Sequence, residues 1–394
     1  MPGTYGVDEE VAMVPSIGDS TSGRAPVLGL PRMHMEAGDR RDFLPGLIAA
    51  ADRAGAREIV LEHGYGSGMS VDPGDYLAAS PKVRFAVLEE VLASDVVTVI
   101  RCPDEPALRS MRPGATLVTM LHYATRPERT RSIADLGLRA ISLDGVVDDL
   151  GRRLVEYLEA VGWNGVRLAF IEIARLHPRF AHPSRRPLRV TCLGAGAVAA
   201  HAVRAATRYG DPELRAELAA NEVPGVEVTV ADFDLTGHED YLLRRLEVSD
   251  LLIDATQRAD TTAPVVPNPL LAALPPDAVI LDLSVDPYDF SVDPPRTKGI
   301  EGVPHGDLDR YIFPIDHPAW DELDRCVDTR QRRLALSCYA WPGIDPLDCM
   351  RVYGRQVESV LSVVLRRPTE KLDVESDDVI ERAVARAEIG RWLS

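Results

Sequence analysis

A glycine-rich turn in the middle of the chain constrains the fold more than any other feature. The apolar stretch Leu188–Leu193 runs into Gly-x-Gly-x-x-Ala, and an alanine-rich helix is expected directly after it. In such a turn the first glycine permits the tight bend, and the second lets backbone approach a pyrophosphate. The alanine allows close packing of helix on strand, while the helix N-terminus offers free N–H groups and a positive dipole end. The pattern predicts a dinucleotide site at Gly194, Gly196, Ala197 and Val198.

A second strand starting at Val226 supports this interpretation. It is expected to end at Asp232 or Asp234, where a carboxylate would accept hydrogen bonds from the adenosine ribose hydroxyls. A 2′-phosphate would be repelled there, so NAD is predicted and NADP is less favoured. The gap from the glycines is longer than usual, and the segment Asp211–Pro224 is expected to form a short helix of its own. The competing interpretation is an ordinary glycine turn of an α/β sheet.

Composition narrows the class of protein. A chain of 394 residues with 45% hydrophobic and 27% charged residues is typical of a soluble protein of two domains. A net charge of −17 argues against nucleic acid or an anionic membrane as partner, and no apolar run reaches the length of a membrane span. A small-molecule amino acid or 2-oxo acid is the expected partner, and a homo-oligomer is left open.

Targeting and redox signals are weak. Residues 1–24 have no basic end and no apolar core, so we expect a flexible tail rather than a signal peptide. The five cysteines show no paired spacing, which fits a reducing cytoplasm. The histidines and cysteines are scattered, so no metal site is predicted.

Alternating strand and helix signals predict the fold class: α/β, with two Rossmann-like, doubly wound parallel-sheet domains and a cleft between them. In the first half, strands are expected at Val27–Leu30, Glu58–Leu61, Val96–Arg101, Thr116–Leu121 and Arg139–Leu143, and helices at Leu44–Ala54 and Val83–Ala93. Helices at Val146–Val161 and Val166–Leu176 would then lead to a Pro/Arg-rich linker, His177–Pro187. In the second half, strands are expected at Leu188–Leu193, Val226–Asp232, Asp250–Asp254, Ala278–Leu283 and Leu334–Cys338, before a long helix, Met350–Leu365.

The corresponding domain plan has five parts. A tail covers residues 1–25, a substrate domain 26–145, bridging helices and linker 146–187, a dinucleotide-binding domain 188–330, and C-terminal helices that return to the substrate domain 331–394. The glycines of Gly64–Gly68 form either a loop near the substrate cleft or a plain turn.

Ligands of open α/β sheets bind beyond the carboxyl ends of the strands, and this rule selects candidate residues. Arg101, His122 and Asp286 each follow such a strand, and Arg40 and Arg41 follow the first one. His122 is the natural acid–base candidate, because imidazole titrates near neutrality, although a single strand-end histidine can also be structural. Arg40 could clamp a carboxylate through two parallel hydrogen bonds or form a solvated ion pair. Asp286 could orient the nicotinamide, the ribose or an amine, or merely start a turn.

In order along the chain, these positions resemble the alanine dehydrogenase and pyridine nucleotide transhydrogenase family, from about Val27 to Leu365. The matching motifs are Gly29-Leu-Pro31 with Arg40 and Phe43-Leu-Pro45, Arg101-Cys-Pro103, Leu121-His122-Tyr-Ala, the turn Gly194–Ala199, the strand ending at Asp232, Val279–Asp286 and Pro342-Gly343.

The resemblance implies an NAD(H)-dependent oxidoreductase acting on the C–N bond of an amino acid or N-substituted amino acid. It implies that Arg40 holds the substrate carboxylate, that His122 transfers a proton at the carbonyl or carbinolamine oxygen, and that Asp286 lies by the nicotinamide and the reacting nitrogen. The family has Lys where this chain has Arg101, which can bind a carboxylate or stabilise an oxyanion but cannot act as a base.

Details of the same motifs indicate a branch within this family and leave two other functions open. Ser284-Val-Asp286-Pro and the doubled Arg40-Arg41 are more similar to the saccharopine dehydrogenase and carboxyethylornithine synthase branch, where a second arginine suits a second carboxylate. One alternative is an ammonia-eliminating lyase that uses NAD transiently, like a cyclodeaminase. Another is a non-catalytic NAD-binding protein, which the arginine at 101 would favour.

Overall fold

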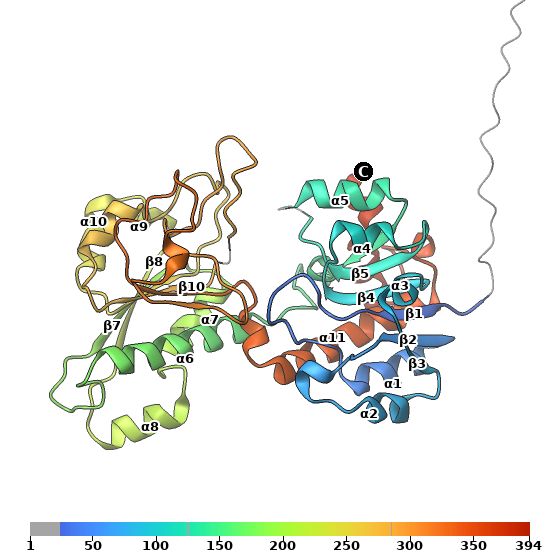
Figure 1. Ribbon diagram of the computed structural model, residues 1–394, viewed down its shortest axis with the longest axis horizontal. Coiled ribbons are helices and arrows are strands. Elements are labelled where there is room, and N and C mark those ends of the chain that lie inside the picture. Colours follow the sequence, from blue (N-terminus) through green and yellow to red (C-terminus); the bar gives the residue numbers. More distant parts are fainter. Residues whose placement is uncertain (1–23, 124–125, 285) are drawn as a thin grey trace, which may run out of the picture.

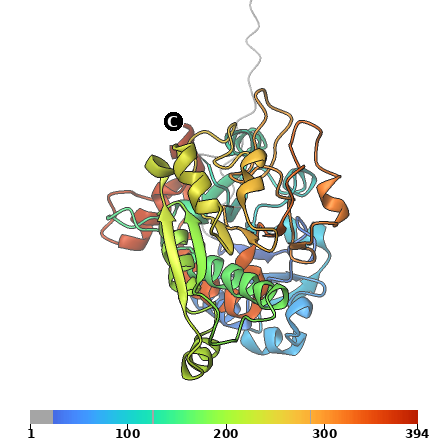
Figure 2. The same cartoon turned by 90° about the vertical axis from the view of Figure 1, so that its left-hand side faces the viewer.

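Two lobes, each organised around a mainly parallel sheet, make up the computed structural model, which describes residues 24–123, 126–284 and 286–394 (Figure 1). Viewed from the side in Figure 2, the second lobe lies in front of the first. The tail expected at residues 1–25 lies outside the described residues except for Arg24 and Ala25. The α/β fold class with two doubly wound domains is confirmed.

The first lobe holds a six-stranded sheet in the order β3-β2-β1-β4-β5-β6, with every pair parallel. Its strands are β1 (Val27–Leu30), β2 (Glu58–Glu62), β3 (Val83–Ala86), β4 (Val96–Arg101), β5 (Thr116–Met120) and β6 (Arg139–Ser142). Its helices in this part of the chain are α1 (Pro45–Ala54), α2 (Pro73–Ala79), α3 (Leu88–Leu92), α4 (Glu105–Arg109) and α5 (Pro127–Asp135).

The second lobe holds a six-stranded sheet in the order β11-β12-β10-β9-β7-β8, parallel except for the pairing of β11 with β12. Its strands are β7 (Leu188–Leu193), β8 (Val226–Ala231), β9 (Leu251–Asp254), β10 (Val279–Asp282), β11 (Ile312–Phe313) and β12 (Leu334–Ser337). Its helices are α6 (Leu158–Leu176), α7 (Ala197–Ala206), α8 (Pro212–Ala220), α9 (Phe233–Thr236) and α10 (Glu239–Leu246). The short helix expected within Asp211–Pro224 is therefore confirmed as α8.

The C-terminal part returns to the first lobe (Figure 1). It comprises α11 (Pro346–Arg366), α12 (Val379–Arg386) and α13 (Ile389–Leu393). Buried residues of α11 such as Val357 and Leu361 share one apolar core with Leu47 and Ile48 of α1. β12 still belongs to the second sheet, although it lies beyond residue 330, where we expected that domain to end.

Two expected helices are wrong in part. Val83–Ala93 is not one helix, because Val83–Ala86 pairs in register with β2 and only Leu88–Leu92 is helical. Pairing with a neighbouring strand outweighs local helix preference over so short a segment. Residues 146–157 are also not helical. The Asp148 carboxylate accepts backbone N–H bonds from Leu150 and Arg152, and it holds a turn there instead.

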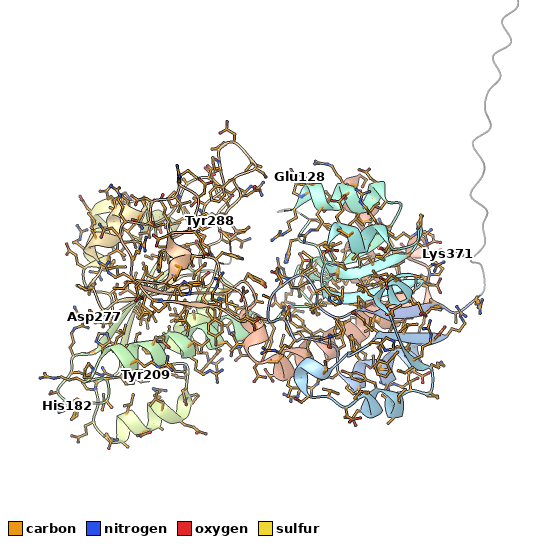
Figure 3. All side chains as sticks on the ribbon, viewed as in Figure 1. Glu128, His182, Tyr209, Asp277, Tyr288 and Lys371 are labelled. Carbon is orange, nitrogen blue, oxygen red and sulfur yellow. The ribbon has the colours of Figure 1, made fainter. Side chains whose placement is uncertain are left out.

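The two helical segments expected around residues 161 and 166 form the single helix α6, despite glycines at 162 and 165. A Cβ at Gly162 would lie 2.7 Å from the backbone nitrogen of Ala202 in α7, so glycine is what lets the two helices pack closely. Phe170 of α6 packs edge-on against Tyr209, with ring centres 5.3 Å apart (Figure 3 labels Tyr209). Tertiary packing therefore compensates for the poor helix propensity of glycine. Over the described residues, no helix is both long and apolar enough to cross a bilayer.

Candidate functional site

Strand order places one switch point in each sheet. In the first sheet the chain passes outward from β1 through β2 and β3, and then returns to β4 on the other side of β1. In the second sheet β8 and β9 flank β7 on opposite sides. Connections leave in opposite directions at such a point and open a crevice beyond the carboxyl ends, where ligands of doubly wound sheets bind.

The glycine turn predicted from the sequence lies at the second switch point. Gly194 follows β7 with φ +90°, and a Cβ there would come within 2.8 Å of the carbonyl oxygen of Ala255, just beyond β9. Gly196 has no atom near the position of a Cβ. It is the residue directly before α7, and no side chain caps that helix end, so first-turn N–H groups including those of Ala197 and Val198 stay available. This open, uncapped helix end has the features that a pyrophosphate requires.

Asp232 comes directly after β8, whereas Asp234 lies within α9. β8 pairs with β7 up to Ala231 opposite Leu193, so Asp232 follows β8 beside the glycine turn. Asp232 is half-buried, its carboxylate does not cap α9, and it forms no ion pair with any described residue. Asp232 is therefore the better placed of the two candidate ribose ligands.

The carboxyl ends of the two sheets meet through Arg101 and Tyr339. Arg101 ends β4, and its guanidinium lies 4.7 Å from the ring centre of Tyr339, which follows β12 of the other lobe. A register shift between Thr98 and Arg101 marks a bulge, a feature that re-aims side chains at strand ends. Arg101 also pairs with Glu36 at 2.6 Å. Burial and the charge of Glu36 hold the pKa of Tyr339 well above its ordinary value.

His122 lies just past β5 in a left-handed conformation, φ +53°, which is unusual for a residue other than glycine. Its Nδ1 lies 3.1 Å from Asp144, and the same carboxylate accepts the backbone N–H groups of Leu121 and His122. Burial acts to raise the pKa of Asp144, but the bonds from His122 and Ser142 outweigh it and hold this pKa far below its usual value. Asp144 thus stays ionised and fixes the orientation of a partly exposed imidazole.

The two arginines after β1 have different environments. Arg40 is exposed and pairs with Asp309 of the second lobe at 3.3 Å. Arg41 is buried, and its guanidinium makes a two-pronged bond with Asp39. Burial opposes the charge of Arg41, yet the bond with Asp39 holds its pKa well above the usual value. Arg41 is therefore satisfied from within the chain, and Arg40 spans the two lobes at the surface.

Sequence reasoning missed Arg126. It lies at the start of α5, where its backbone N–H bonds the carbonyl of His122 at 3.0 Å. Burial and the neighbouring charges of Arg129 and Arg101 lower the pKa of Arg126. The charge of Glu36 acts in the opposite direction but is the weaker influence, and no carboxylate among the described residues forms an ion pair with this half-buried guanidinium, so an anion there would be stabilised. Its position four residues after a strand-end histidine was the available signal.

Asp286 follows β10 and forms an ion pair with Arg258 at 2.7 Å. The Arg258 guanidinium is nearly buried and also donates to the carbonyl oxygens of Ala263 and Thr297. Arg258 therefore ties the segment carrying Asp286 to two neighbouring loops of the second lobe. Tyr288, labelled in Figure 3, lies two residues further along and donates to the carbonyl of Val303.

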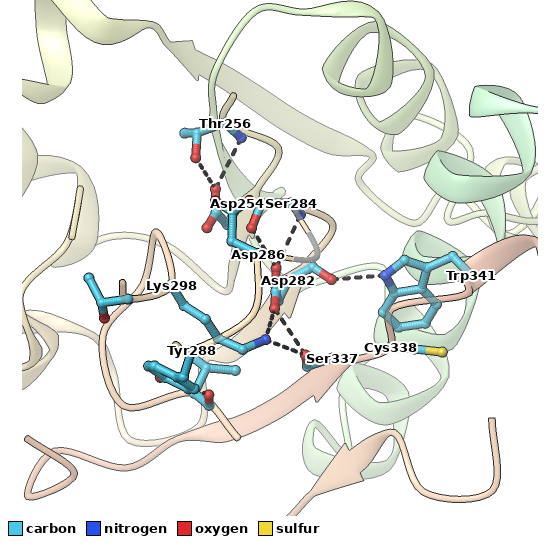
Figure 4. A network of polar contacts seen from close by, with 12 residues as sticks. Asp254, Thr256, Asp282, Ser284, Asp286, Tyr288, Lys298, Ser337, Cys338 and Trp341 are labelled. Atoms are coloured by element: carbon cyan, nitrogen blue, oxygen red, sulfur yellow. Dashed lines mark hydrogen bonds and ion pairs between the residues drawn. The ribbon is translucent and has the colours of Figure 1, made fainter. Parts of the chain in front are cut away.

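A buried charged cluster underlies this segment (Figure 4). Lys298 forms an ion pair with Asp282 at the end of β10, and Ser337 at the end of β12 bonds both. Burial acts to raise the pKa of Asp282, but the ammonium of Lys298 holds it below the ordinary value.

Asp254, at the end of β9, is equally buried and lacks such a cation. Burial, and then the charge of Asp282, raises the pKa of Asp254 to about 6. Its Oδ2 has no hydrogen-bond partner among the described residues, and Thr256 bonds only the other oxygen. Neither Lys298 nor Asp254 is among the site residues predicted from the sequence. No group of three or more metal-ligating side chains occurs in the part of the chain that the structure describes.

Comparison with known proteins places this arrangement in context. The family model "Alanine dehydrogenase/PNT, N-terminal domain" matches residues 37–159. Alanine dehydrogenase of Mycolicibacterium smegmatis is 24% identical over 270 residues, which cover 66% of this chain and 72% of that protein. The alpha subunit of NAD(P) transhydrogenase from Haemophilus influenzae is 19% identical over 387 residues, covering 91% of this chain and 70% of that protein.

A solved structure of L-alanine dehydrogenase has the same fold. It superposes with a TM-score of 0.66 at 18% sequence identity, covering 92% of this chain and 94% of the other. The likeness therefore extends over both lobes, although the family model covers the first lobe alone.

Proposed function

We propose that this chain belongs to the alanine dehydrogenase/PNT family, whose N-terminal domain model it matches, and that it is an NAD(H)-dependent oxidoreductase acting on the C–N bond of an amino acid or N-substituted amino acid. The observation that carries the proposal is the contact of Arg101 with Tyr339. It brings the strand ends that present His122 together with the lobe that presents the glycine turn. A nucleotide and a small acid could then meet between the lobes.

The described residues fit NAD(H). The uncapped N-terminus of α7 suits the pyrophosphate, and the open space at Gly196 allows its approach. The unpaired carboxylate of Asp232 suits a ribose with two free hydroxyls, which supports NAD over NADP. Bound NAD(H) would supply or accept the hydride.

The chain's own groups would bind the acid and move the proton. Arg126, which forms no ion pair among the described residues, would hold the substrate carboxylate, and Arg101 would join it once its pair with Glu36 opened. His122 would give a proton to the carbonyl or carbinolamine oxygen in the reductive direction and take one in the reverse direction. The Asp144 carboxylate would keep one proton on Nδ1 of His122, so that Nε2 would be the nitrogen that exchanges a proton with the substrate.

This assignment differs from the expectation for Arg40 and Arg41. Arg41 is already paired with Asp39, so it would bind substrate only if that pair opened. A second substrate carboxylate, as in the secondary amines of the saccharopine branch, would then be bound by Arg40 at the surface. We include this branch in the proposal on the doubled arginine and the Ser284-Val-Asp286-Pro pattern.

The test is NADH consumption, followed at the nicotinamide absorbance, with 2-oxo acids and ammonia or primary amines. His122→Gln should cut turnover at least a hundredfold and leave NADH affinity unchanged, because general acid–base catalysis contributes about that much or more. His63→Gln is the matched control, since His63 is an exposed histidine just past β2, which lies three strands away from β5 in the first sheet. Full activity in His122→Gln would contradict the proposed proton transfer. Product formation with no net change in NADH would point to the lyase.

A further inference from the structure

A pocket opens at the first lobe's switch point, between the carboxyl ends of β1 and β4. Of the thirteen residues that line it, eight are apolar. Leu92 and Val99 are deeply buried, and Met35 is 38% exposed. The side chains that form its apolar wall are Met33, Met35, Leu88, Leu92, Val99 and Ala107.

The polar residues around this pocket are largely engaged elsewhere. Asp39 is held by Arg41, and His34 lies 2.8 Å from Glu62. The Asp104 carboxylate accepts the N–H of Ala107 and caps α4. The cations in its wall are Arg32, whose Nε has no hydrogen-bond partner among the described residues, and Arg101, so a carboxylate would bind on that side. The rest of the wall suits an apolar group, because a charged group there would lose water and find its polar neighbours engaged.

Arg101 lines the same pocket and also contacts Tyr339 of the other lobe. A carboxylate bound at this guanidinium would therefore have the apolar wall of the pocket on one side and the second lobe, which carries the glycine turn, on the other. This is the arrangement that a 2-oxo acid needs if its reacting carbon is to face the nucleotide while its side chain points away.

We propose that this pocket receives the side chain of the substrate, and that the acid carries an apolar side chain larger than a methyl group. The proposal rests on the function proposed above and adds the substrate class. The Met33 and Met35 side chains suit it, because flexible thioethers adapt to irregular apolar shapes.

The experiment measures binding without turnover. Isothermal titration calorimetry compares the 2-oxo acid of leucine with pyruvate, in the presence of NADH and the absence of any amine. The leucine analogue has three more carbon atoms to bury, so it should bind more tightly by a factor on the order of 50. Equal affinity of the two acids would overturn the proposal.

A substitution that fills the pocket provides the second arm. Ala107→Phe should reduce the affinity ratio of the two acids to within a few-fold of one, because the phenyl ring occupies the space of the side chain. Ala219→Phe, at an exposed alanine of α8 in the other lobe, should leave the ratio unchanged. If Ala107→Phe does not fold, Met35→Gln at the partly exposed rim should lower the same ratio. An unchanged ratio in the folded pocket variant would overturn the proposal.

Failure of the proposed function would look different. Selective binding of the larger acid, with no NADH consumption on adding ammonia or an amine, would leave the pocket standing and remove the dehydrogenase activity. NADH consumption with equal affinity for the two acids would support the dehydrogenase activity and overturn the proposed side-chain pocket.

Discussion

The two glycines of the nucleotide turn should respond differently to the same substitution. Gly194 has φ +90°, and a Cβ there would lie 2.8 Å from the carbonyl oxygen of Ala255 and 3.1 Å from the Cα of Thr256. Gly196 has an ordinary φ of −72°, and nothing lies within 4 Å of its Cβ position. Gly194→Ala therefore strains the free protein, whereas Gly196→Ala changes only the space that the nucleotide would occupy.

The size of the effect follows from these contacts. A non-glycine residue in the left-handed region costs about 1–2 kcal/mol, and the backbone contacts add roughly 1 kcal/mol. Gly194→Ala should then lower the free energy of unfolding of the second lobe by about 2–3 kcal/mol, or the Tm by roughly 5–10 °C. Gly196→Ala should stay within about 0.5 kcal/mol of the parent protein.

Binding of NADH separates the two roles. Gly196→Ala should weaken NADH binding by about tenfold or more, measured by calorimetry, because its methyl group lies where the pyrophosphate approaches. Thermal unfolding without ligand supplies the stability comparison. A Gly196→Ala variant that binds NADH as tightly as the parent would refute the assignment of this turn to the pyrophosphate. Loss of stability in Gly196→Ala but not in Gly194→Ala would refute the account of the backbone.

Three further outcomes are expected. Arg126→Gln should raise the KM for the 2-oxo acid by about tenfold or more, whereas Arg131→Gln, at an exposed residue of the same helix, should not; equal KM values for the two variants would remove Arg126 from the site. Asp232→Ala should weaken NADH binding and bring the affinities for NADH and NADPH closer together. An unchanged ratio of the two affinities, measured by titrating each nucleotide, would contradict the proposed contact of Asp232 with the ribose. Asp254 has its folded pKa raised from 3.8 to about 6, so the folded state holds its proton more tightly and stability falls as pH rises through this window. The free energy of unfolding of Asp254→Asn, measured with urea, should therefore rise relative to that of the parent by up to about 3 kcal/mol between pH 4 and pH 7. A difference between the two proteins that stays constant across this range would exclude the effect.

Local sequence was sufficient for much of the fold. Short, mostly apolar and β-branched segments such as Val96–Arg101 and Leu188–Leu193 are typical of strands that are buried on both faces of a parallel sheet. The glycine turn after β7 was readable because its backbone requirement is met by few residues other than glycine. The strand-end positions of Arg101 and His122 followed from the same runs, although their chemical roles remain predictions.

Long-range contacts decided the rest. Val83–Ala86 is a strand because β2 lies beside it, and α6 continues through Gly162 because α7 packs against that glycine. The partners of the arginines were also hidden, since an ion pair such as Arg101 with Glu36 joins residues 65 positions apart in the chain. Periodicity records which face of an element is apolar, but not which distant charge will lie against it. Only the folded chain therefore showed that Arg41 is paired with Asp39, that Arg126 forms no ion pair with a described residue, and that Lys298 neutralises Asp282 beneath the site.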